Sequence, residues 1–75
     1  MNIPTENQIK RVKNDWEKIA KETIEIEYCN GTFYGYGSEL ATLRIYKEYT
    51  LITKSEKVRQ EYSKNLKTYF FALDI

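Results

Sequence analysis

The sequence predicts a single α+β domain, residues 1–75, in which a small antiparallel β-sheet of two hairpins packs against one or two helices. Three observations predict this fold: an amphipathic helical stripe near the N-terminus, an Asn-Gly turn signal between two alternating runs, and an apolar run at residues 69–73. With 75 residues, the chain is near the lower size limit at which one core suffices without disulfides or metals.

The first predicted element is a helix that begins after Thr5. Thr5 is a favourable N-cap, and Gln8 three residues later completes a capping box. One side of this helix is mainly basic, and a mostly apolar stripe lies on the other. The stripe consists of Ile9, Val12, Trp16, Ile19, Ala20 and Thr23. It predicts the face that packs against the sheet.

Asn30-Gly31 predicts a two-residue type I′ turn, because both residues tolerate the positive φ that this turn needs. The turn fixes how the run before it pairs with the run after it. The face expected to meet the core carries Ile24, Ile26, Tyr28, Phe33 and Gly35. The opposite face carries Glu25, Glu27, Tyr34 and Tyr36. Gly35 and Gly37 leave room on the core face for a helix to approach closely.

Residues 38–49 are predicted as a second helix. Ser38 is a strong N-cap, and Glu39 lies near the positive end of the helix dipole. A strand is the alternative, because this segment is rich in Thr, Ile and Tyr, which favour strands.

Residues 58–73 are predicted as a second hairpin with a four-residue turn at residues 64–67. This hairpin would gather Val58, Tyr62, Tyr69, Phe71 and Leu73 on one face. The alternative is a helix over residues 55–66, capped by Ser55, before a final strand.

Composition excludes several kinds of chemistry. The chain has no His, which removes His-based acid–base catalysis, Ser-His and Cys-His nucleophiles, and His metal sites. The residues that share a strand face with the single cysteine, Cys29, are Glu25 and Glu27, and their negative charge does not favour a thiolate. No phosphate-binding loop, EF-hand loop or paired-cysteine motif is present. We therefore predict that the protein is not an enzyme and has no catalytic, metal-binding or cofactor-binding residues.

The N-terminus lacks the apolar region of a signal peptide, and no apolar run approaches the length of a membrane span. A single cysteine cannot form an internal disulfide, which fits a reducing compartment. The formal net charge of +1 at pH 7 creates no bulk attraction to nucleic acid or to an anionic membrane. These observations predict a cytoplasmic protein that makes no membrane contact.

The outer face of the first hairpin is the candidate protein-binding surface. It consists of Glu25, Glu27, Tyr34 and Tyr36. Exposed Tyr is enriched at protein interfaces, because it buries a large area at little entropic cost and keeps a polar tip. The alternative is that a second layer of the protein covers this face.

A nucleic-acid-binding surface in the C-terminal half is the alternative function. Its candidate residues are Arg59, Lys64 and Lys67, interleaved with Tyr62 and Tyr69. Basic residues that alternate with aromatic ones can follow phosphates while stacking bases. Acidic residues dilute this patch, and the near-neutral net charge favours solvated charges instead.

Two segments carry a resemblance to known sequences. Residues 34–44, with Gly-Ser-Glu-Leu-Ala, and residues 62–70, with Tyr-Ser-Lys-Asn-Leu, resemble small uncharacterised proteins of phages and mobile elements. The resemblance implies no established activity and no functional residues. By analogy with such proteins, we expect a protein-binding module that occupies an unidentified host protein, most concretely an anti-CRISPR-like inhibitor of host defence.

The final strand is apolar on both faces, with Phe71 on one side and Phe70 on the other. Such a strand is either central in a covered sheet or an edge that seeks a partner. Helices can cover only one of its faces, so we expect a two-fold homodimer that buries Phe70. The alternative is a monomer in which the ends of the chain cover Phe70.

Overall fold

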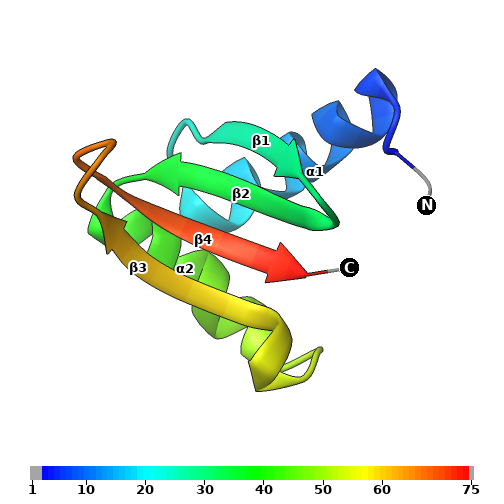
Figure 1. Ribbon diagram of the computed structural model, residues 1–75. Coiled ribbons are helices and arrows are strands. Elements are labelled where there is room, and N and C mark those ends of the chain that lie inside the picture. Colours follow the sequence, from blue (N-terminus) through cyan, green and yellow to red (C-terminus); the bar gives the residue numbers. More distant parts are fainter. Residues whose placement is uncertain (1–2, 75) are drawn as a thin grey trace.

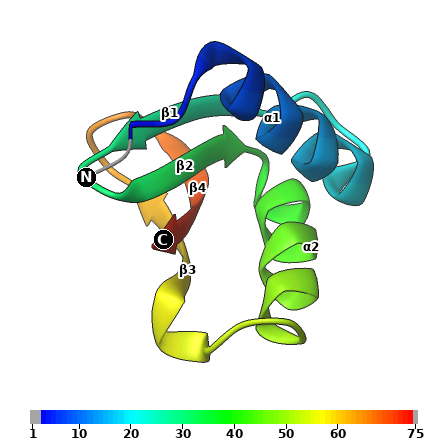
Figure 2. The ribbon, with the colours of Figure 1, turned by 90° about the vertical axis from the view of Figure 1, so that its right-hand side faces the viewer.

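A four-stranded antiparallel sheet carries two helices on one face in the computed structural model, which describes residues 3–74 (Figures 1 and 2). The elements are α1 (Glu6–Ala20), β1 (Glu25–Cys29), β2 (Thr32–Gly37), α2 (Glu39–Thr50), the 3-10 turn η1 (Ser55–Lys57), β3 (Val58–Ser63) and β4 (Thr68–Asp74). The strand order is β1-β2-β4-β3, so the last strand of the chain lies inside the sheet. The predicted α+β class is confirmed.

The predicted capping box begins α1. The Thr5 hydroxyl accepts a hydrogen bond from the backbone N–H of Gln8 at 3.2 Å, and the Gln8 side-chain oxygen accepts one from the Thr5 N–H at 2.8 Å. The helix ends at Ala20, and its C-cap residue Lys21 has a left-handed φ of 60°. Trp16 and Ala20 are buried, as the apolar stripe predicted.

The predicted register of the first hairpin is confirmed. Glu25 lies opposite Tyr36, and Glu27 lies opposite Tyr34. The turn residues have positive φ, 47° at Asn30 and 83° at the following glycine, as a type I′ turn requires.

The structure decides between helix and strand for residues 38–49 and between hairpin and helix for residues 58–73. The segment after Ser38 is a helix, and the Ser38 hydroxyl accepts a hydrogen bond from the N–H of Ala41 at 3.1 Å. The segment after residue 57 is a hairpin whose strands are joined by residues 64–67. The alternative was a helix over residues 55–66, but only residues 55–57 of that span are helical.

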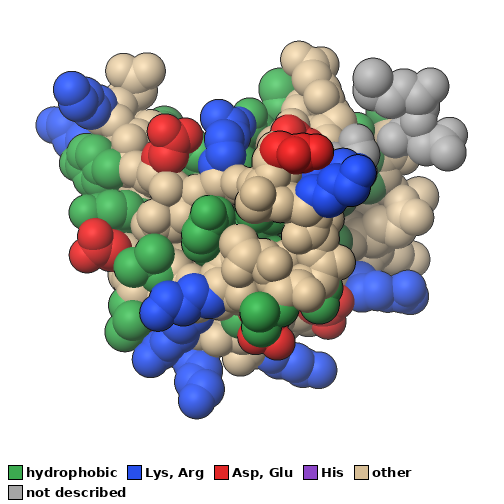
Figure 3. Space-filling model, turned by 90° about the horizontal axis from the view of Figure 1, so that it is seen from below, with side chains coloured by type: hydrophobic (Ala, Val, Ile, Leu, Met, Phe, Trp, Pro, Cys, Tyr) green, Lys and Arg blue, Asp and Glu red, His purple; other side chains and the backbone are tan. Residues whose placement is uncertain are grey.

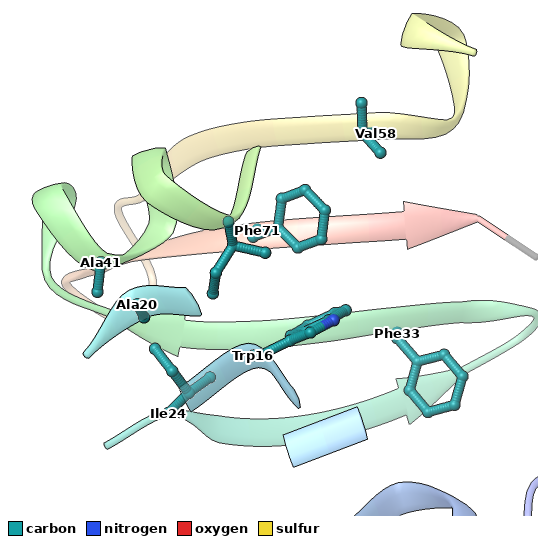
Figure 4. Packing of buried hydrophobic residues seen from close by; sticks show 8 residues of the cluster. Trp16, Ala20, Ile24, Phe33, Ala41, Val58 and Phe71 are labelled. Carbon is teal, nitrogen blue, oxygen red and sulfur yellow. The ribbon is translucent and has the colours of Figure 1, made fainter. Parts of the chain in front are cut away.

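Trp16 lies at the centre of the core, between the helices and the sheet (Figure 4). Its ring meets those of Phe71 and Phe33 edge to face, with centroids 4.9 Å and 6.5 Å away. The buried indole N–H donates to the Tyr49 hydroxyl of α2 at 2.9 Å. A single side chain therefore joins both helices and two strands.

Two side chains of α1 hold the backbone of Ile24, the residue that precedes β1. The Lys13 ammonium donates to the Ile24 carbonyl, and the Glu17 carboxylate accepts from its N–H at 3.0 Å. Lys13 and Glu17 also form an ion pair at 3.1 Å. On the other side, Arg44 of α2 donates to the carbonyl of Ala20 at 2.9 Å. These contacts fix α1 against both β1 and α2.

Candidate protein-binding site

The sheet face that points away from the helices is covered by no described element (Figure 2). We call it the open face, and Figure 1 shows it turned toward the viewer. Its side chains form cross-strand rows, because antiparallel partners point to the same side. The two central rows are Glu25, Tyr36, Phe70 and Glu61, and Glu27, Tyr34, Ala72 and Arg59.

Three aromatic rings gather at the middle of the open face. The rings of Tyr34 and Tyr36 are nearly parallel, at 15°, with centroids 6.4 Å apart. Phe70 meets Tyr34 at 5.9 Å and Tyr36 at 6.4 Å. All three rings are half-buried, and they rest on one another rather than under another layer. Beside them Ala72 is only 1% exposed, because larger side chains flank it across the sheet.

A hydrogen bond fixes one tyrosine to the acidic strand next to it. The Tyr36 hydroxyl donates to the Glu27 carboxylate at 3.0 Å. Partial burial of the ring, reinforced by this hydrogen bond and by the negative charge of Glu27, raises the pKa of Tyr36 to about 12. The phenol therefore stays neutral and keeps the Glu27 carboxylate in place on the open face.

The charged strand residues of the open face are mainly acidic. Four of them carry a carboxylate and one carries a guanidinium: Glu25, Glu27, Glu61 and Asp74 against Arg59. Arg59 lies 3.6 Å from Glu61, and both side chains are about half exposed. Such an exposed pair contributes little to stability. Strand β1, Glu25–Cys29, contributes two carboxylates and no cation to the open face.

The four residues predicted as a protein-binding surface thus lie together, and no described element covers them. Sequence reasoning did not include Phe70 among the contact residues. The alternation along 69–73 indicates that Phe70 points away from Phe71. Its position beside Tyr36 depends on the pairing of β2 with β4, which no local signal in the sequence specifies.

The residues of the nucleic-acid alternative do not share one surface. Arg59 lies on the open face, whereas Tyr62 and Tyr69 point to the helix side of the sheet. Lys64 and Lys67 lie in the turn that joins β3 to β4. Seen from below the view of Figure 1, Lys and Arg side chains are interspersed with acidic and hydrophobic ones (Figure 3). This arrangement offers no continuous basic track with rings along it among the described residues.

Tyr62 and Tyr69 form a pair of their own, with centroids 5.1 Å apart. The negative charge of Glu39, in the first turn of α2, is the main cause that raises the pKa of Tyr69. Other exposed apolar side chains are Leu40, in the first turn of α2, and Leu66, in the β3–β4 turn. Tyr62 is half exposed and lies off the open face, so it is a suitable control for the rings on that face.

Cys29 is exposed at the end of β1 and makes no disulfide. Among residues 3–74, no group of three His, Cys, Asp or Glu side chains is arranged to hold a metal ion. In the same part of the chain, no helix has both the length and the apolar character needed to cross a membrane.

A scan against protein-family models, a search of curated proteins and a search of solved structures found no match to this chain.

Proposed function

We propose that this protein is a non-catalytic protein-binding module whose contact surface is the open face of the sheet. One observation carries the proposal: Tyr34, Tyr36 and Phe70 form an aromatic cluster on a face that no described element covers. Aromatic side chains of this kind dominate binding energy at protein interfaces, because they bury a large area and lose little entropy.

The rigidity of the surface supports this function. Each tyrosine lies on a central strand, and the hydrogen bond from Tyr36 to Glu27 holds one ring in position before any partner arrives. A preorganised surface loses less entropy on binding than a flexible loop. The core beneath it, centred on Trp16, holds the strand that carries both tyrosines.

The partner class follows from the resemblance of residues 34–44 and 62–70 to small phage and mobile-element proteins. We propose that the open face binds a host protein, specifically one that acts in defence against such elements. This step is an analogy between sequences. It requires no catalytic residue and no cofactor.

Affinity capture from bacterial lysate, followed by mass spectrometry, tests the function. The unmodified protein is compared with Tyr34→Ala/Tyr36→Ala, which removes two rings from the open face, and with Tyr62→Ala, which removes a half-exposed ring elsewhere. Circular dichroism checks that each variant is folded. We expect a host protein that is captured by the wild type and Tyr62→Ala but lost with the double variant.

Recovery of no specific protein, or equal recovery by all three proteins, contradicts the proposal. A gel-shift series at low salt tests the nucleic-acid alternative, and retention of DNA or RNA that depends on Arg59, Lys64 and Lys67 would favour it. The homodimer predicted from the sequence would bury Phe70 on this same face, and sedimentation equilibrium at micromolar concentration checks whether a second copy competes with a partner there.

A further inference from the structure

The open face combines two features that together specify the chemistry of a partner. Its centre is aromatic, and the strand on one side, β1, presents two carboxylates with no cation on the same strand face. We infer that the open face binds a basic segment of the partner protein, with arginine side chains that pair with Glu25 and Glu27 and lie on the rings of Tyr34 and Tyr36. This inference rests on the proposed function and names the partner chemistry for the same site.

The cross-strand register places one carboxylate beside each tyrosine. Glu25 lies directly opposite Tyr36, and Glu27 lies directly opposite Tyr34. Directly opposed side chains in an antiparallel pair have Cβ atoms about 5 Å apart. A guanidinium can pair with a carboxylate through its planar fork while its flat face rests on an aromatic ring. Each Glu–Tyr pair therefore offers one arginine both kinds of contact.

The spacing of the two pairs matches an extended peptide. The pairs are two residues apart along each strand, which corresponds to about 7 Å. In an extended peptide, side chains on one side recur at the same interval of about 7 Å. An extended segment with arginine at alternate positions can therefore place successive guanidinium groups on successive Glu–Tyr pairs.

The charges of the open face argue against two other occupants. Four carboxylates against one guanidinium give this face an excess of three negative charges. Phosphate groups of a nucleic acid would meet like charge there. A second copy of the same face would bring the same excess against itself. A basic protein segment is the occupant whose charge complements the face.

Nuclear magnetic resonance with isotopically labelled protein tests the inference. The probe is a synthetic peptide that alternates arginine and serine, and its matched control alternates glutamate and serine. We expect the arginine peptide to shift the amide signals of β1, β2 and β4, with binding that weakens as salt is raised. No shift, shifts confined to other elements, or equal shifts with the glutamate peptide would overturn the inference. Shifts of the same signals caused by raising the protein concentration alone would identify a second copy as the occupant and would also overturn it.

A pair of charge variants separates a local site from general electrostatics. Glu25→Gln/Glu27→Gln removes the two carboxylates of β1 and leaves the rings in place. Glu48→Gln/Glu56→Gln changes the net charge by the same amount at exposed positions off the open face. Loss of two exposed ion pairs should weaken the arginine peptide by roughly 2- to 30-fold in the first variant only. Equal weakening in both variants, or none in the first, would refute a site at Glu25 and Glu27.

The same Glu25→Gln/Glu27→Gln variant, added to the lysate capture, distinguishes this inference from the proposed function. A partner that is lost with Tyr34→Ala/Tyr36→Ala and also with the glutamine variant supports both. A partner that is lost only with the tyrosine variant leaves the protein-binding function standing and overturns the basic segment. A capture in which no partner depends on the tyrosines overturns the function itself.

Discussion

The indole ring of Trp16 occupies the space in which a side chain at Gly35 would lie. A Cβ atom at Gly35 would be 2.6 Å from both Cε3 and Cζ3 of the indole. The glycine is required because the α1 ring rests directly on the β2 backbone, and not because of an unusual φ. This contact connects the core to the candidate site, since Tyr34 and Tyr36 flank Gly35 on the opposite face of the same strand.

Gly35→Ala is therefore expected to destabilise the fold by about 1–3 kcal/mol, the usual cost of overpacking a core. Gly37→Ala is the control, because its closest Cβ contact would be the terminal Cδ1 atom of Ile24, at 2.8 Å, rather than a rigid aromatic ring. Urea denaturation measures both free energies of unfolding. An equal loss for the two variants would contradict the role of the Trp16 ring.

Tyr49→Phe removes the only acceptor that the described residues offer to the buried indole N–H of Trp16. An unpaired buried donor costs about 1–3 kcal/mol, so the free energy of unfolding should fall by that amount. Trp16 is the single tryptophan, and its fluorescence should report the lost hydrogen bond directly. Tyr46→Phe is the control, since the Tyr46 hydroxyl makes no hydrogen bond among the described residues. Unchanged stability and emission in Tyr49→Phe would show that the hydrogen bond is unimportant.

Glu17→Gln is expected to change how the free energy of unfolding depends on pH in the acidic range. The hydrogen bond from the Ile24 N–H, followed by that from Lys13, lowers the pKa of Glu17 below its usual 4.5. A lowered pKa contributes stability that is fully present above pH 4.5 and is lost as pH falls through the folded-state value. The variant should be less stable than the wild type at pH 7, and the difference should shrink as the pH falls below 4.5.

Denaturation curves at several pH values, from neutral to strongly acidic, measure this difference. Glu48→Gln is the matched control, because it removes an exposed carboxylate that makes no hydrogen bond in the described part of the chain. If the difference in free energy of unfolding between Glu17→Gln and the wild type stays constant over the whole pH range, the result would contradict a stabilising hydrogen bond from the Ile24 N–H to the Glu17 carboxylate.

Tyr36→Phe is expected to reduce the loss of stability in alkali. The pKa of Tyr36 is raised from 10.0 to about 12 in the folded protein, so the unfolded chain loses the phenol proton at a lower pH than the folded protein does. The free energy of unfolding therefore falls as pH rises from 10 to 12. The phenylalanine variant lacks this proton, so its free energy of unfolding should fall less over that range. Solvent reaches the ring, so the effect is smaller than for a fully buried tyrosine.

Chemical denaturation of the wild type and Tyr36→Phe, from about pH 9 to about pH 12, makes this comparison, with Tyr62→Phe as a half-exposed control. A wild type and a Tyr36→Phe variant that lose stability in parallel would contradict the raised pKa of Tyr36 in the folded protein.

Local signals in the sequence determined the first helix, the start of the second helix at Ser38, and the first hairpin with its turn. Thr5 and Ser38 cap the two helices as predicted, and Asn30-Gly31 sets the register that places Glu25 and Glu27 opposite tyrosines. These features depend on residues only a few positions apart, so the chain specifies them without reference to the rest of the fold. The same register groups the four candidate contact residues on one face of the hairpin.

Only the tertiary structure decided what those residues lie beside. Placing β4 between β2 and β3 brings Phe70 to Tyr36 and leaves the face uncovered by any described element, and both outcomes depend on pairing between segments that lie far apart in the chain. Local propensity carries no information about such long-range pairing, because it arises from packing of the whole core. The alternatives for residues 38–49 and 58–73 stayed open in the sequence for the same reason. Both segments contribute residues to the core cluster around Trp16, and packing of that core selects a helix in one case and a hairpin in the other.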